Sequence, residues 1–283
     1  MTQQFPRTLV GGISMPRLII GTNWFLGYSH TSLAKDKFIK EYQNRKRIAD
    51  IMTTFFEVGC NAVMSPFSPI IKDAMKDAED RTGIQSIWIT TPLFNVPGHF
   101  FQEGVTLEKA LDDCAEQGAT FCFPHQCMTD TLIDKMERKI RQMDVISKAI
   151  RERGMIPGLS THMPESVQIA DESGADVETY IQLYNAQGFL MQVEVDWIMK
   201  VIHNAKKPVM TIKPLAAGRL MPVVGLSYVW NTIRDIDMVT IGTTTVDEAK
   251  EVIDLSFDFL EKRLPDYKLQ ETRSKGMLRQ LNK

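Results

Sequence analysis

Between residues 155 and 251 the chain repeats one unit four times: an apolar run, a polar residue at its end, a glycine or proline turn and a stretch with helical periodicity. The four runs end at residues 160–162, 184–185, 213 and 242–244. Short buried strands that alternate with amphipathic helices must lie parallel in a covered sheet, because each crossover helix returns the chain to the same edge. The polar residues that follow the strands are therefore expected to meet at one rim.

The same cadence extends backward through the first half of the chain. It predicts eight strands, at residues 17–21, 61–64, 86–90, 120–124, 155–160, 180–184, 208–213 and 238–242. Eight strands in 283 residues fit a (β/α)8 TIM barrel, whose usual size is about 250 residues. An open doubly wound sheet would also alternate, but eight evenly spaced units with polar residues at most strand ends favour closure. We expect residues 1–283 to form this single domain.

The segments between and around the strands are also interpretable. Residues 48–56 carry one apolar helix face, and Leu132, Ile133, Met136, Ile140, Met143 and Ile150 indicate another helix before Gly154. Thr8 to Ile13, around Gly11-Gly12, predict a hairpin that plugs the bottom of the barrel. Residues 267–283 read as a basic, polar tail or helix.

The composition restricts the partners and the location. The chain is 43% hydrophobic and 24% charged, with 33 basic against 35 acidic residues, so we expect no nucleic-acid or membrane surface. The N-terminus lacks the apolar core of a signal peptide, which predicts a cytoplasmic protein. Trp197 and Trp230 could mark the contact of a homo-oligomer, although core packing explains them as well. Cys122, His125 and Cys127 have the spacing of zinc ligands, but core filling by reduced thiols is the favoured interpretation.

Three of the five histidines follow predicted strands. His30, His125 and His162 come after strands 1, 4 and 5, where barrel enzymes build their sites. Imidazole titrates near neutral pH and can pass protons in either direction, so His125 and His162 are candidates for acid and base. The three histidines could instead bind a divalent metal, although the rim has few carboxylates to assist them.

Cationic and small polar residues follow the last two strands. Lys213 would stabilise an oxyanion as a charge clamp, or would form a Schiff base if burial lowered its pKa, and the clamp is favoured. Arg219 follows in the same loop. Gly242, Thr243 and Thr244 offer amides and hydroxyls to a small anion at the start of the last helix, while Asp247 and Glu248 oppose this by capping the helix themselves.

Further polar and aromatic residues at the strand ends are candidates for substrate binding. Asn23, Trp24 and Tyr28 lie in an aromatic loop after strand 1 that could wall the pocket. Tyr184 and Asn185 end strand 6. We expect Asn23, Tyr184 and Asn185 to orient the substrate.

Four short segments resemble the aldo/keto reductase superfamily, whose members are NADP-linked barrel enzymes that reduce carbonyls. They are Met15-Pro-Arg-Leu-Ile-Ile-Gly-Thr, Gly158-Leu-Ser-Thr-His, Lys213-Pro-Leu-Ala-Ala-Gly-Arg-Leu and Val239-Thr-Ile-Gly-Thr-Thr-Thr-Val-Asp-Glu. The resemblance covers most of the chain and is strongest after Met155. It implies an active site of an aspartate and a tyrosine after strand 2, a lysine after strand 3 and a histidine after strand 4.

Most of those family residues are missing. The aspartate position falls at residues 64–66, the lysine position falls at residues 91–92, and only the histidine matches, as His125. Ser160 and Gln182 resemble the serine and glutamine that contact nicotinamide, and the basic residues that hold the adenosine phosphate are absent from residues 243–249. NADP is therefore a possible but disfavoured cofactor.

These residues together predict a barrel enzyme that uses acid and base chemistry, of the lyase, isomerase or aldolase type, on a small polar carbonyl or sugar-derived substrate. Three alternatives stay open: an NADP-dependent reductase, a metal enzyme that uses the three rim histidines, and an inactive barrel retained as a binding protein.

Overall fold

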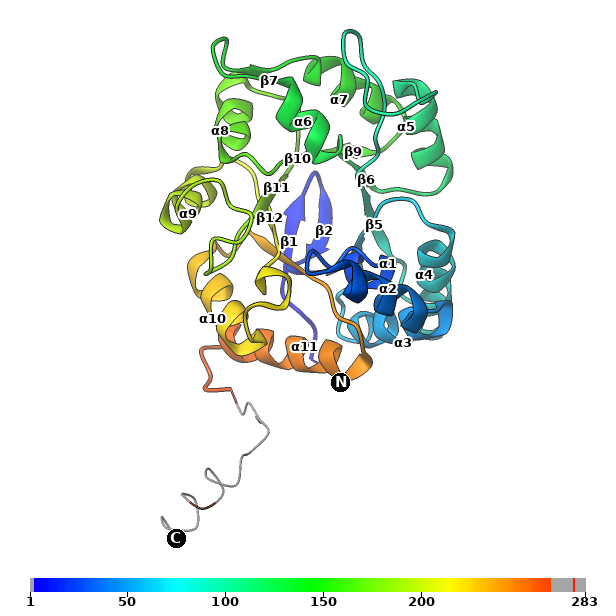
Figure 1. Cartoon of the computed structure of the whole chain (residues 1–283), viewed down its shortest axis with the longest axis vertical. Coiled ribbons are helices and arrows are strands. Elements are labelled where there is room, and N and C mark those ends of the chain that lie inside the picture. The colour runs from blue at the N-terminus through cyan, green and yellow to red at the C-terminus, as the bar shows by residue number, and fades with distance from the viewer. Residues whose placement is uncertain (1–2, 266–276, 278–283) are drawn as a thin grey trace.

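The chain folds into a ring of parallel strands surrounded by helices, as a computed structural model shows (Figure 1). The structure describes residues 3–265 and residue 277, so the tail or helix expected at residues 267–283 lies outside the described residues apart from Met277. The predicted (β/α)8 barrel is confirmed, because all eight expected strands are present.

The parallel sheet has the strand order β10-β11-β12-β13-β3-β4-β5-β6-β9. Its members are β3 (Leu18–Gly21), β4 (Ala62–Met64), β5 (Ile87–Thr90), β6 (Phe121–Cys122), β9 (Ile156–Pro157), β10 (Leu159–Ser160), β11 (Tyr180–Leu183), β12 (Val209–Ile212) and β13 (Met238–Ile241). β9 and β10 are two halves of the fifth predicted strand. β9 pairs with β6 and β10 pairs with β11, so the continuous chain through Gly158 completes the ring.

Gly158 explains why the fifth strand is divided. A Cβ atom at this position would lie 2.2 Å from Cε1 of Phe123, whose ring is fully buried. Only a glycine lets the backbone come this close to the ring, and the approach interrupts the ladder at that residue. The division therefore follows from packing inside the barrel.

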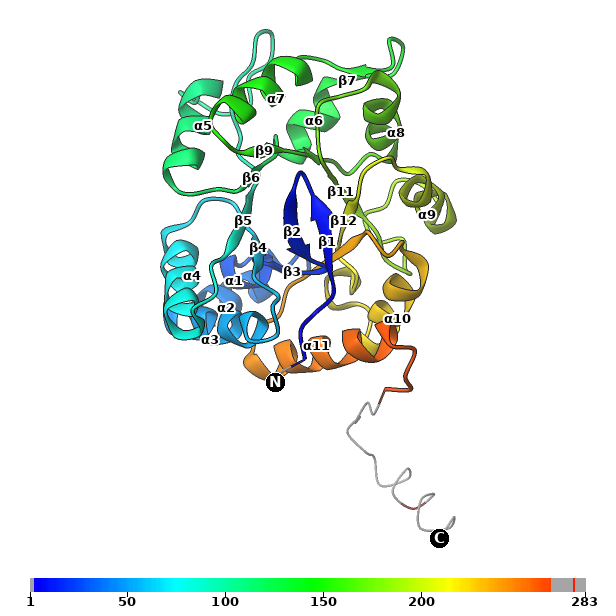
Figure 2. The same cartoon turned by 180° about the vertical axis from the view of Figure 1, so that it is seen from behind.

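Helices cover the outside of the ring, and Figure 2 shows the same arrangement from behind. Side-chain oxygens of Asn44, Thr106 and Thr245 accept hydrogen bonds at three helix starts, and left-handed glycines such as Gly83 and Gly174 end two others. The helices are α1 (Asn23–Leu26), α2 (Leu33–Tyr42), α3 (Arg45–Phe56), α4 (Pro69–Thr82), α5 (Leu107–Glu116), α6 (Gln126–Leu132), α7 (Met143–Glu152), α8 (Pro164–Ser173), α9 (Val195–Asn204), a 3-10 turn at Ala216–Gly218, α10 (Pro222–Thr232) and α11 (Val246–Leu260).

The single helix predicted across residues 132–150 is wrong. α6 ends at Leu132, and a small hairpin of β7 (Ile133–Asp134) and β8 (Lys139–Ile140) precedes α7. The carboxylate of Asp134 accepts hydrogen bonds from the amides of Met136 and Glu137, and this local turn competes with helix formation. The apolar side chain of Met136, which suggested a helix face, is 93% exposed.

The expected N-terminal hairpin consists of β1 (Arg7–Val10) and β2 (Ile13–Pro16), joined by Gly11 and Gly12. Both glycines have positive φ, as a two-residue hairpin turn requires. Val10 and Met15 are buried against the interior side chains Ile19, Met210 and Met238, among others. The hairpin therefore plugs the N-terminal end of the barrel, and it lies in the centre of the ring in both views (Figures 1 and 2).

The larger hydrophobic core lies between the strands and the helices. Trp230 belongs to it, because its ring is buried and its Nε1 donates a hydrogen bond to Ser256. Of the two tryptophans considered for a subunit contact, only Trp197 is exposed. No helix in the described part of the chain combines the length and the apolar character that a bilayer crossing requires.

Candidate active site at the barrel mouth

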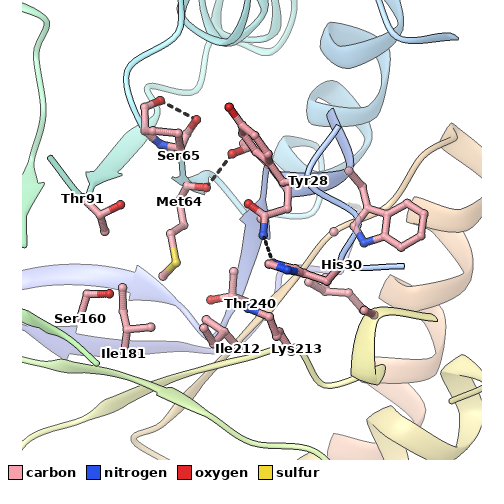
Figure 3. A pocket seen from close by; sticks show the side chains of 18 of the residues that line it. Tyr28, His30, Met64, Ser65, Thr91, Ser160, Ile181, Ile212, Lys213 and Thr240 are labelled. Atoms are coloured by element: carbon pink, nitrogen blue, oxygen red, sulfur yellow. Dashed lines mark hydrogen bonds between the residues drawn. The ribbon is translucent and has the colours of Figure 1, made fainter. Parts of the chain in front are cut away.

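A cavity of about 1410 Å³ opens at the C-terminal ends of the strands. Figure 3 shows Ser160, Ile181, Ile212 and Thr240 on the strands, with Tyr28 and His30 from the loop after β3 nearby. Eleven of the thirteen predicted site residues line this cavity: Asn23, Trp24, Tyr28, His30, His125, His162, Lys213, Arg219, Gly242, Thr243 and Thr244. The three side chains on which the acid and base hypothesis depends, His125, His162 and Lys213, are among them.

Lys213 reaches the cavity because the backbone turns sharply at this residue. Side chains alternate along β12, so that Met210 packs in the barrel interior and Val209 packs against the helices. A regular strand would send Lys213 outward, on the same side as Val209. Lys213 instead has a φ of 60°, a left-handed conformation that is costly for a residue with a Cβ atom, and it lines the cavity.

The ammonium group of Lys213 forms no ion pair or hydrogen bond with any residue between 3 and 265. Burial disfavours the charged form and lowers the pKa of Lys213 to about 8, and no described partner offsets this effect. A cation in this position favours a ligand with a negative or strongly polarised group.

His162 lies in the turn that follows β10. Burial, the charge of Lys213 and the neighbouring His125 and His30 together lower the pKa of His162 to about 4. His162 is therefore a neutral imidazole at pH 7 and can accept a proton. The carboxylate of Asp130 fixes this turn by accepting hydrogen bonds from Thr161 Oγ1 at 2.5 Å and from the His162 amide at 3.2 Å.

His125 has a defined tautomer. Its Nδ1 accepts a hydrogen bond from the amide of Cys127 at 3.3 Å, at the start of α6. Burial lowers the pKa of His125, so the ring is neutral at pH 7 and its proton resides on Nε2. The Nε2–H group can therefore donate a hydrogen bond or a proton to a substrate oxygen.

The loop after β3 and the loop after β12 hold each other at the rim. His30 has a φ of 55°, and its Nε2 lies 3.5 Å from Asn23 Nδ2. Arg219 donates a hydrogen bond to the carbonyl oxygen of His30 at 3.3 Å, and its guanidinium stacks 4.0 Å above the centre of the Phe189 ring. Burial and the Lys213 charge lower the pKa of His30.

Two threonines that line the cavity have a role that the sequence did not predict. Thr240 was not predicted as a site residue, and Thr243 was predicted only as part of an anion site. The hydroxyls of Thr240 and Thr243 are buried and have no hydrogen-bond partner among the described residues, although both threonines line the cavity. Such a group is costly unless a ligand or water satisfies it. The signal for Thr240 was present in the sequence, because it is the one polar residue at an inward position of β13, two residues after Met238.

The structure places Tyr184 and Asn185 elsewhere, so these two predicted contacts to substrate are corrected. Tyr184 is buried under the helices, where its hydroxyl bonds to Tyr228 at 3.0 Å and Thr232 at 2.9 Å. The amide group of Asn185 bonds in both directions to the backbone of Phe189. Neither residue lines the cavity.

The end of the cavity beside α11 does not fit the phosphate of a dinucleotide. Glu248 accepts a hydrogen bond from the Thr244 amide at 2.6 Å, so a carboxylate occupies the amide that an anion would need. Glu251 also lines this end. Gln182, which resembled a nicotinamide contact, is fully buried and does not line the cavity, whereas Ser160 does.

The described residues contain no group of three or more histidine, cysteine, aspartate or glutamate side chains that could hold a metal ion. His30, His125 and His162 share the cavity without forming such a group. The alternative of a metal held by these three histidines is therefore not supported by their arrangement.

No family model matches the chain, and no curated protein matches it in sequence. Solved structures do resemble it. A protein assigned as an aldo-keto reductase from Pseudomonas aeruginosa has a TM-score of 0.63 at 12% identity over 92% of this chain and 98% of that one. Aldose reductase from Giardia lamblia has a TM-score of 0.55 at 11% identity over 89% of each chain.

Barrels with other chemistry are also similar. A truncated 3-deoxy-D-arabino-heptulosonate 7-phosphate synthase from Thermotoga maritima has a TM-score of 0.51 at 9% identity over 92% of this chain and 90% of that one. At these identities the likeness shows the fold alone. The resemblance to aldo-keto reductases found in the sequence is confirmed for the barrel, and most of that family's catalytic residues are missing from this chain.

Proposed function

We propose that the chain is an enzyme that moves protons at the carbon next to the carbonyl of a small, hydroxylated or anionic aldehyde or ketone. Such a step begins isomerase, lyase and aldolase reactions alike. The observation that carries the proposal is the placement of Lys213, a half-buried cation without a counter-ion among the described residues, in one cavity with the neutral imidazoles of His125 and His162.

Each group has a distinct part in this proposal. Lys213 stabilises the negative charge that develops on the carbonyl oxygen. His162, which is neutral at pH 7, accepts the proton from carbon, and His125 donates from Nε2 to the oxygen. The unpaired hydroxyl of Thr240 supplies a hydrogen-bonding group for a substrate hydroxyl.

A nicotinamide has no part in the proposal, because Glu248 and Glu251 stand where its nucleotide phosphate would need cations. The similar barrels include reductases and a synthase, so the fold is compatible with more than one chemistry. The distinction between the isomerase, lyase and aldolase classes depends on the bond that breaks after the proton has left.

The experiment is deuterium incorporation from D2O next to the carbonyl of small probes, followed by proton NMR. Glycolaldehyde, dihydroxyacetone, glyceraldehyde and pyruvate cover the neutral and anionic cases. We expect exchange of at least one probe to exceed the rate of the same reaction with the His162→Asn protein by more than tenfold. Equal rates with wild type, with His162→Asn and without protein would contradict the proposal.

A further inference from the structure

The environment of Lys213 suits an amine nucleophile better than a permanent cation. The apolar side chains Ile181, Ile212 and Leu215 line the same cavity, and no carboxylate among the described residues pairs with Lys213. With a pKa of about 8, roughly a tenth of the amines are neutral at pH 7, compared with about one in 2,500 for an ordinary lysine. The left-handed turn at residue 213 fixes the base of this side chain and directs it to the cavity.

We propose that Nζ of Lys213 forms an imine with the carbonyl carbon of the substrate. This inference rests on the proposed function and specifies its substrate class, an aldehyde or unhindered ketone. The imine would replace the oxyanion as the acceptor of electrons from the neighbouring carbon, because an iminium nitrogen accepts electrons better than a carbonyl oxygen does.

The step balances with the residues of the cavity. The lone pair of Nζ forms the C–N bond, and the Nε2–H group of His125 donates a hydrogen bond to the carbonyl oxygen. His162 takes one proton from the new ammonium nitrogen and delivers it to that oxygen, which gives a carbinolamine. A second proton passes from nitrogen to the hydroxyl in the same way, the C–O bond breaks, and water leaves as the C=N bond forms. One amine and one carbonyl give one imine and one water, so no oxidant or reductant takes part.

The hydroxyls of Ser160 and Thr240 complete the geometry. Ser160 lines the cavity from β10 and Thr240 lines it from β13, with β11 and β12 between them, and neither side chain forms a hydrogen bond with another described residue. A carbinolamine carries a hydroxyl that the original carbonyl lacks, and a hydroxylated substrate adds more. The hydroxyls of Ser160 and Thr240 can therefore form hydrogen bonds with the carbinolamine hydroxyl or with a substrate hydroxyl, which the charge of Lys213 alone would not select.

The test traps the imine in the full-length protein. The protein is incubated at pH 7 with a small excess of glycolaldehyde and sodium borohydride, and its intact mass and tryptic peptides are measured. We expect the addition of one hydroxyethyl group per chain, located on the peptide that contains Lys213. Labelling spread evenly over the surface lysines of the wild-type protein would overturn the proposal, whatever the variants show.

Two variants sharpen the result. Lys213→Arg keeps the positive charge but cannot form an imine, and it should lose labelling at this peptide by more than tenfold. Lys200→Arg, an exposed lysine outside the cavity that pairs with Asp196, should label like wild type. Labelling that persists in Lys213→Arg overturns the inference.

Trapping and exchange also separate this inference from the proposed function. Deuterium exchange without any trapped adduct would overturn the imine and leave the acid and base function standing. A trapped adduct on Lys213 without deuterium exchange would support the imine and contradict the proposed proton transfer.

Discussion

The carboxylate of Asp130 accepts a hydrogen bond from the backbone amide of His162 at 3.2 Å and thereby fixes the turn that carries this imidazole. Asp130 does not line the cavity, so it is a positioning residue. Burial raises the pKa of Asp130, and its two oxygens accept from the Thr161 hydroxyl and from the His162 amide.

Asp130→Asn replaces one accepting oxygen by an NH2 group. This donor will face either the Thr161 hydroxyl or the His162 amide, which are donors themselves. We expect the exchange rate at saturation to fall roughly tenfold with little change in KM, because the imidazole loses its alignment. Stability should fall by about 1–3 kcal/mol, and the pH midpoint assigned to His162 should move. Asp112→Asn, which removes an exposed ion pair with Arg153, is the matched control and should change neither rate nor midpoint. An unaltered pH profile in Asp130→Asn would limit Asp130 to a structural role.

We expect His162 and His125 to be required for exchange but to contribute little to the stability of the fold. His162→Asn removes the base, and we expect exchange to fall by a factor of about 10²–10⁴. His125→Asn should lose the acid while retaining the helix cap, because the asparagine oxygen can accept the Cys127 amide; its unfolding free energy should change by less than about 1 kcal/mol. His203→Asn, at the end of α9 and outside the cavity, is the control and should keep full exchange. Full exchange in both cavity variants would refute the assignment.

Anion binding should be coupled to proton uptake. The positive charge of Lys213 contributes to the low pKa of His162, so an anion beside Lys213 will raise that pKa from about 4. The same anion will raise the pKa of Lys213 above about 8. Protons should therefore be taken up on binding near pH 5 and again near pH 8–9, and affinity should fall as the pH rises through the lysine pKa. Titration calorimetry with pyruvate in buffers of different ionisation enthalpy measures the uptake; proton release at either pH would reverse the sign and contradict the model of charge coupling.

Gly158 should be intolerant of a side chain. A methyl group there would overlap the ring of Phe123, so Gly158→Ala is expected to destabilise the barrel by about 1–3 kcal/mol in urea unfolding. Phe123→Leu alone will also cost stability, but the double variant should be less unstable than the sum of the two single changes. If the losses of unfolding free energy in the two single variants added up strictly in the double variant, the contact with Phe123 would not be the cause of the destabilisation by Gly158→Ala. Gly225 is not a suitable control, because a Cβ there would meet the backbone of Pro214 at 2.6 Å.

The alternation of apolar runs and helices was sufficient to predict the barrel, its eight strands and the N-terminal plug, because these follow from periodicity and from the direction of parallel strands. The face to which a strand residue points was harder to predict. In a parallel sheet covered on both sides, inward and outward positions are both apolar, so nothing in the sequence showed that Tyr184 points outward with Tyr180.

Other features depended on tertiary contacts that periodicity does not encode. The left-handed turn at Lys213 brings to the cavity a side chain that strand alternation would have sent outward. The hairpin at residues 133–140 arises from the side chain of Asp134, and the apolar spacing of that segment concealed it. Asp130 was not predicted because it lies 32 residues before His162 in the sequence, and only the fold brings the two together.

The β1–β2 hairpin has a consequence for turnover. Since Val10 and Met15 fill the end of the barrel opposite the cavity, reactants and products exchange through the same mouth. A product that lingers there excludes the next molecule of reactant, so we expect its inhibition to be competitive and its departure to limit the rate once the chemical steps are fast.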